Sequence, residues 1–193
     1  MTTRKIDALV GTTAAPFEYG NTFERQVVGR QTRLTIGFDD AHDRCVLALA
    51  ERLTAPFQLL LVLHTTRTGA SLGRYESPEL SLQQVRAFLY RFGPFLSQDA
   101  RHDFWLRSHG DDATIVLDRH NIIYAYGPLP AFEAALERIG GHRLGLPSLP
   151  DPHVHYYHRA WDEAEREILA AVPWTRKPLN RSDVQCNADE QAG

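Results

Sequence analysis

The stretch from Phe57 to Leu63 constrains the fold of this chain more than any other segment. It reads Phe-Gln-Leu-Leu-Leu-Val-Leu, so apolar side chains fall on both faces of an extended backbone. A short apolar run of this kind, following Pro56, is typical of a strand in the middle of a sheet that is covered on both sides. We therefore expect a domain in which helices pack on a central sheet.

The residues before this strand predict a strand and a helix. Apolar residues alternate with polar or small ones from Leu34 to Phe38, which is the pattern of a strand with one buried face. Apolar residues then recur at helical spacing between 46 and 53, behind aspartates that can cap a helix. The order strand, helix, strand predicts a right-handed βαβ unit in which segments 34–38 and 57–63 pair in parallel.

Three further helices are predicted in the rest of the chain. Ser81 and Gln84 match the capping box that begins a helix, and Gly93-Pro94 is expected to end it. Helical periodicity returns in residues 129–139 and again in 161–172.

An antiparallel hairpin is predicted between the first two of these helices. Segments 113–117 and 122–126 are apolar, and they flank Asp118-Arg119-His120-Asn121. Asp and Asn favour turns because their side chains bond to nearby backbone groups. We interpret these four residues as a hairpin turn rather than as part of a reactive site.

These elements predict a single α+β (or α/β) domain. Its core would be residues 24–172, with a mixed sheet of about five strands packed by three to four helices. Residues 1–23 show no sustained periodicity and are expected to form an arm or a short strand. Residues 173–193 are polar and aperiodic, and we expect a flexible C-terminal tail.

Charge and composition narrow the classes of function. The 193 residues carry 21 Lys and Arg against 24 Asp and Glu, and the net charge of −3 makes nucleic acid an unlikely partner. No apolar run approaches the ~20 residues of a membrane span, and the first residues do not form a secretion signal. Two cysteines, Cys45 and Cys186, suggest neither a metal motif nor a disulfide framework, so a cytoplasmic location is expected. Only two of the 21 basic residues are lysines. Codon bias in a GC-rich bacterial genome explains this preference for arginine better than a role in binding phosphate or carboxylate groups.

A group of histidines near the C-terminus is the first candidate site. His153 and His155 lie on the same side of an extended segment. If His158 opens the helix that follows, Asp162 lies one turn further along it. Imidazole and carboxylate groups are ligands of divalent transition metals. An exposed strand of histidines with local hydrogen bonds is the alternative, so no cofactor is required by the sequence.

The second candidate site is the loop that follows the central strand. Residues 65–74 are rich in threonine and glycine, and Arg67, Ser71 and Arg74 could bind a phosphate or a carboxylate. The loop matches neither a Walker A nor a dinucleotide-binding motif. A surface excursion without a ligand is the alternative interpretation.

The sequence favours a non-enzymatic, protein-binding function over catalysis. No nucleophile elbow, zinc-protease motif or kinase motif is present. We therefore expect an immunity, adaptor or regulatory protein that binds a protein partner or forms a homo-oligomer. The alternative is a small-molecule enzyme that uses the His153/His155/His158 group, with or without a divalent metal, and the Arg67/Arg74 loop for an anionic substrate.

Overall fold

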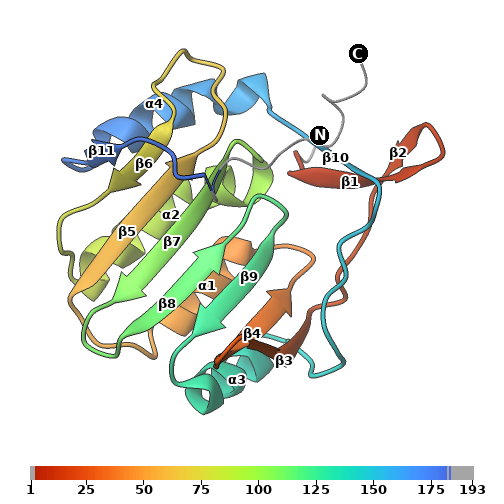
Figure 1. The fold of residues 1–193 in the computed structure, drawn as a ribbon, viewed down its shortest axis with the longest axis vertical. Coiled ribbons are helices and arrows are strands. Elements are labelled where there is room, and N and C mark those ends of the chain that lie inside the picture. Colours follow the sequence, from red (N-terminus) through yellow and green to blue (C-terminus); the bar gives the residue numbers. More distant parts are fainter. Residues whose placement is uncertain (1–2, 182, 184–193) are drawn as a thin grey trace.

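A computed structural model describes residues 3–181 and 183, and within them the chain forms two antiparallel sheets and four α-helices (Figure 1). The larger sheet has eight strands, in the spatial order β11 (Thr175–Lys177), β6 (Gly73–Glu76), β5 (Phe57–Leu63), β7 (His102–Ser108), β8 (Ala113–Leu117), β9 (Ile122–Tyr126), β4 (Gln31–Gly37) and β3 (Thr22–Val28). The helices are α1 (His42–Ala50), α2 (Leu82–Gln98), α3 (Leu129–Arg138) and α4 (Asp162–Ala170). None of these described helices has the length and apolar character that crossing a membrane requires.

The core lies between one face of the large sheet and helices α1 and α2. Alternate residues of β5, such as Leu59 and Leu61, are buried on this face, and Phe104 and Leu106 of β7 continue the same layer. Figure 1 shows α1 and α2 behind the sheet. The helix α3 packs beside α1, and α4 packs on α2. The strand predicted at 57–63 is therefore confirmed, but α1 and α2 cover only one face of the sheet there, whereas helices on both faces were expected.

The predicted parallel βαβ unit is wrong. Strands β4 and β5 run in the same direction, but β7, β8 and β9 lie between them, and all neighbouring strands pair antiparallel. The sheet is thus neither mixed nor limited to five strands. The difference arises because residues 102–126 form consecutive hairpins, which fill the space that a direct parallel pair would occupy.

Two local predictions are confirmed and one is corrected. The hairpin β8–β9 forms as expected, and Ser81 and Gln84 make the predicted capping box at the start of α2. The helix does not end at Gly93-Pro94, however, but continues to Gln98. Burial of Phe95 and Leu96 in the core offsets the hydrogen bond that the proline cannot donate.

Both chain ends contribute strands. The predicted N-terminal arm forms β1 (Ile6–Val10) and β2 (Thr13–Ala15), which make a small sheet in the order β10-β1-β2 with β10 (His153–His155). The segment predicted as a flexible tail begins with β11, which pairs with β6, and Trp174 packs edge-on against Phe88 at a centroid distance of 6.0 Å. The rest of that predicted tail, residue 182 and residues 184–193, lies outside the described residues.

Candidate metal centre

The turn between β8 and β9 presents a histidine in a fixed orientation. Oδ1 of Asp118 accepts hydrogen bonds from the backbone N–H groups of His120 and Ile122, at 2.8 and 2.9 Å. Asn121 has a φ of 63°, a left-handed conformation that asparagine tolerates, and its N–H donates to the carbonyl of Asp118. The short side chain of Asp118 thus closes the turn and holds His120 in place, with 9% of the residue exposed.

The strand β10 brings two more histidines to the same place. It pairs with β1 so that His155 lies opposite Ile6 and His153 lies opposite Ala8. Residues two apart in a strand project to the same side, and the rings of His153 and His155 are 4.9 Å apart. The small sheet is tied to the hairpin turn by Lys5, whose Nζ donates to the carbonyl of Asp118 at 2.9 Å.

The three imidazole rings form a nearly equilateral triangle. The ring centroid of His120 is 5.2 Å from that of His153 and 4.9 Å from that of His155. One ligand atom from each histidine lies within 4.8 Å of the other two. A tetrahedral ion with Zn–N bonds of 2.0–2.1 Å holds three imidazole centroids about 5 Å apart, so the spacing of these rings fits one such ion.

On two of the three rings a hydrogen bond at Nδ1 leaves Nε2 free. Nδ1 of His120 lies 3.0 Å from Oδ2 of Asp118, and Nδ1 of His153 lies 2.9 Å from the carbonyl oxygen of Pro150. Both acceptors are oxygens, so the neutral tautomer that satisfies each bond carries its proton on Nδ1 and has its lone pair on Nε2. Nε2 of His155 is buried without a hydrogen-bond partner among the described residues. Metal-binding histidines have the same arrangement of a donated Nδ1–H and an open Nε2.

Burial keeps one of the three histidines, His155, in the protonation state that a metal ligand needs. Burial lowers the pKa of His155 to about 3, and the charges of His120 and Arg119 add to this effect. His155 is therefore neutral at physiological pH, as a ligand must be. Burial also lowers the pKa of Lys5 to about 8, opposed by the charge of Asp118.

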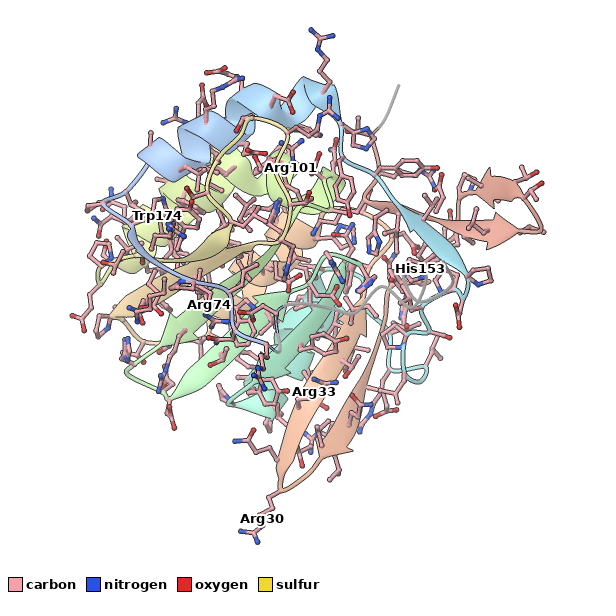
Figure 2. All side chains as sticks on the ribbon, turned by 45° about the horizontal axis from the view of Figure 1, so that its top comes forward. Arg30, Arg33, Arg74, Arg101, His153 and Trp174 are labelled. Carbon is pink, nitrogen blue, oxygen red and sulfur yellow. The ribbon has the colours of Figure 1, made fainter. Side chains whose placement is uncertain are left out.

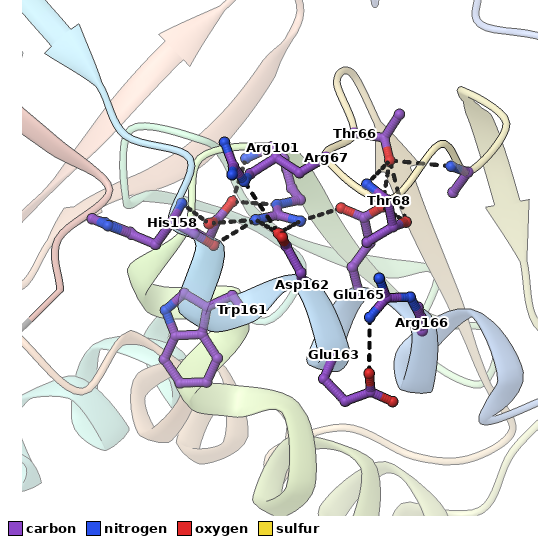
Figure 3. Close-up of polar contacts among 12 residues, drawn as sticks. Thr66, Arg67, Thr68, Arg101, His158, Trp161, Asp162, Glu163, Glu165 and Arg166 are labelled. Carbon is purple, nitrogen blue, oxygen red and sulfur yellow. Dashed lines mark hydrogen bonds and ion pairs between the residues drawn. The ribbon is translucent and has the colours of Figure 1, made fainter.

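The other two metal ligands predicted from the sequence have different partners. Nε2 of His158 lies 2.7 Å from the carbonyl oxygen of Arg4, and the backbone N–H of His158 donates to Oδ2 of Asp99. Asp162 accepts hydrogen bonds from Arg67 and Arg101 (Figure 3). The structure thus joins His153 and His155 to His120 rather than to His158 and Asp162, because the chain leaves the strand after His155 and enters the 3-10 turn η1 (Arg159–Trp161) before α4.

Both arginines of the predicted anion-binding loop form ion pairs with carboxylates of the protein itself. Nε of Arg67 donates to Asp162 at 3.2 Å, and Nη1 of Arg74 donates to both oxygens of Asp183 at 2.8 and 3.0 Å. The carbonyl of Ser71 accepts a hydrogen bond from the hydroxyl of Tyr75. Arg67 lies beside α4, whereas Arg74 lies on the opposite, helix-free side of the sheet near Trp105 (Figure 2). The three residues do not surround one ligand site with the histidines.

Two cavities lie beside His120. One, of about 460 Å³, lies between the N-terminal segment and α1, and the other, of about 340 Å³, lies between the β3–β4 hairpin and the loop before β10. His120 lines both of them. A small molecule in either cavity would therefore contact His120, one of the three histidines of the candidate metal centre.

Comparison with known proteins gave no match to any family model, any curated protein or any solved structure. The assignment of this site as a metal centre therefore rests on the geometry of its residues alone. His120 was missed from the sequence because Asp-Arg-His-Asn has the composition of an ordinary turn, which it also forms. The signal that could have found it was a histidine in a turn next to a carboxylate, but only the fold brings that turn to β10.

Proposed function

We propose that this protein binds one divalent transition metal ion through His120, His153 and His155, with zinc as the first candidate. The observation that carries the proposal is the triangle of imidazoles whose centroids are 4.9–5.2 Å apart. Three nitrogens and no sulfur suit zinc, iron, nickel and copper more than magnesium or calcium.

The ligand number favours a reactive ion over a structural one. Structural zinc sites have four protein ligands, whereas catalytic sites have three and keep a position for water or substrate. Bound at three histidines, such an ion supplies a Lewis acid and lowers the pKa of a bound water. Asp118 would orient His120, and the neighbouring cavities would admit a substrate. A metal-dependent enzyme acting on small molecules is the function that this arrangement supports best.

The test is metal content and ligand identity in protein purified without a histidine tag. We expect one equivalent of Zn²⁺ or Co²⁺ per chain, and a Co²⁺ absorption spectrum of tetrahedral or five-coordinate type. His120→Ala and His153→Ala should each lower the affinity at least tenfold. His158→Ala tests the ligand set expected from the sequence, and the exposed His109→Ala serves as the matched control. Neither control should change the affinity.

Substoichiometric binding by the wild-type protein would contradict the proposal. Equal losses in His158→Ala and His120→Ala would contradict the assignment of the ligands. The protein-binding function favoured by the sequence stays a prediction, and affinity purification from the native host addresses it separately.

A further inference from the structure

The cavity of about 340 Å³ beside His120 is lined in part by polar side chains of the large sheet. Strand β3 contributes Gln26, strand β4 contributes Arg33 and Thr35, and strand β9 contributes Tyr124. The loop that leads to β10 closes the opposite side through Leu146, Pro147 and Leu149. A volume of this size holds a small organic molecule rather than a macromolecular segment.

Arg33 is held rigidly in this wall. Its guanidinium lies over the ring of Tyr124, with 3.9 Å between the Cζ atom and the ring centroid. Nε and Nη2 donate to Oε1 of Gln26 at 3.0 and 2.8 Å, and Nη1 donates to the hydroxyl of Tyr126 at 3.0 Å. An arginine fixed in this way loses little conformational entropy when a ligand binds.

The hydrogen bonds that fix Arg33 do not neutralise it. Both accepting oxygens, Oε1 of Gln26 and the hydroxyl of Tyr126, belong to uncharged groups. The guanidinium has five N–H groups, so one on each terminal nitrogen is left to donate to a ligand. Oε1 of Gln26 also accepts from the hydroxyl of Thr35 at 2.9 Å, and this orients the amide so that its nitrogen is a further donor. Arg33 differs in this respect from Arg67 and Arg74, which are paired with carboxylates.

One acidic side chain shares the cavity. Asp118 lines it together with His120, but both of its carboxylate oxygens accept hydrogen bonds from the turn that it closes. A metal ion on the histidines would add two positive charges beside His120, which lines this cavity. The donors of Arg33 and Gln26, together with such an ion, are suited to a ligand that carries negative charge.

We propose that this cavity binds a small organic anion, a carboxylate or a phosphate, whose oxygens accept hydrogen bonds from Arg33 while the rest of the molecule faces the metal at His120. The proposal rests on the proposed function, because it assigns the substrate class of the same site. Arg33 is a binding residue in this account, and Gln26 and Thr35 position it.

The experiment is isothermal titration calorimetry of the zinc-loaded protein at pH 7 with two probes, inorganic phosphate and succinate. Arg33→Met removes the charge and keeps the length of the side chain. Arg30→Met is the matched control, since Arg30 lies exposed at the tip of the same hairpin (Figure 2). We expect at least one probe to bind, with an affinity about tenfold or more lower in Arg33→Met and unchanged in Arg30→Met. The probe with the higher affinity identifies the class of oxyanion.

Failure of this inference can be told apart from failure of the metal site. Zinc bound by the wild type, but neither probe bound or both bound equally by Arg33→Met, would overturn the anion site and leave the metal site standing. If the wild type binds no zinc, the proposed function fails, and the same titration of the metal-free protein decides whether Arg33 alone binds an anion. Zinc retention by Arg33→Met verifies that the variant is folded.

Discussion

We expect Arg101→Met to lower the free energy of unfolding by about 3–5 kcal/mol, because it leaves buried carboxylates without their counter-charge. The guanidinium of Arg101 is completely buried, and it donates to both oxygens of Asp99 at 2.7 and 3.0 Å. It also pairs with Glu165 and Asp162 of α4 and donates to the carbonyl of His158 at 3.0 Å (Figure 3). Asp99 and Glu165 are 0% and 1% exposed.

Glu165 depends on these contacts for its charge. Burial alone would raise the pKa of Glu165, but hydrogen bonds from Thr66, Thr68 and Arg101 hold the pKa below its ordinary value. The charged form thus stabilises the fold above the pKa of the unfolded chain, and this stabilisation is lost as the pH falls below it. Removing Arg101 removes the cation that pairs with Asp99 and Glu165 and leaves the hydroxyls of Thr66 and Thr68 to solvate the Glu165 carboxylate.

The assay is thermal unfolding followed by circular dichroism. For a chain of this size 1 kcal/mol corresponds to about 2–4 °C, so the melting temperature should fall by about 6–20 °C. The control is Arg86→Met, which breaks an exposed ion pair with Glu51 and should cost less than about 1 kcal/mol. If Arg101→Met does not fold, Glu165→Gln tests the same network more mildly. An Arg101→Met melting temperature no lower than that of Arg86→Met would refute the reasoning.

Three further predictions follow from the site and the core. Asp118→Asn should lower zinc affinity about 10–100-fold in a chelator competition assay, because it weakens the bond that orients the adjacent histidine; unchanged affinity would contradict it. Burial lowers the pKa of His42 to about 3 and holds the pKa of His102 well below its ordinary value. Below about pH 6.5 these two histidines therefore bind protons in the unfolded chain but not in the folded protein. In urea unfolding, the free energy of unfolding should decrease as the pH is lowered below about 6.5, by up to about 1.4 kcal/mol per pH unit for each histidine. A free energy of unfolding that does not change with pH in this range would contradict the prediction. Gly93→Ala should lower stability by about 1–3 kcal/mol although alanine favours helices, since its Cβ would overlap the side chain of Asp43, and equal or greater stability in urea would count against that contact.

Local elements of the fold could be predicted from the sequence, whereas strand order could not. The capping box at Ser81 and the turn at 118–121 depend on residues within a few positions of one another, and both form as predicted. The position of β4 beside β9 depends on pairing between residues far apart in the chain. The parallel pairing expected for β4 and β5 is wrong because the strands that follow β5 in the sequence lie between the two, and the strand pattern of a sequence does not indicate which strands become neighbours.

The candidate site shows the same division. The spacing of His153 and His155 was sufficient to place them on one side of a strand. His158 and Asp162 were assigned on the assumption that the segment stays close to that strand, but the chain turns away and Asp162 binds Arg101 instead. The third histidine comes from a different sheet, and nothing in the local sequence relates it to β10.

The most direct test of the metal centre is an anomalous difference map at the zinc absorption edge, from crystals of tag-free protein grown with one equivalent of zinc. We predict a single strong peak inside the triangle of His120, His153 and His155, with Zn–N distances of about 2.0–2.1 Å to all three. A peak at His158 and Asp162, or no peak within reach of His120, would contradict the account.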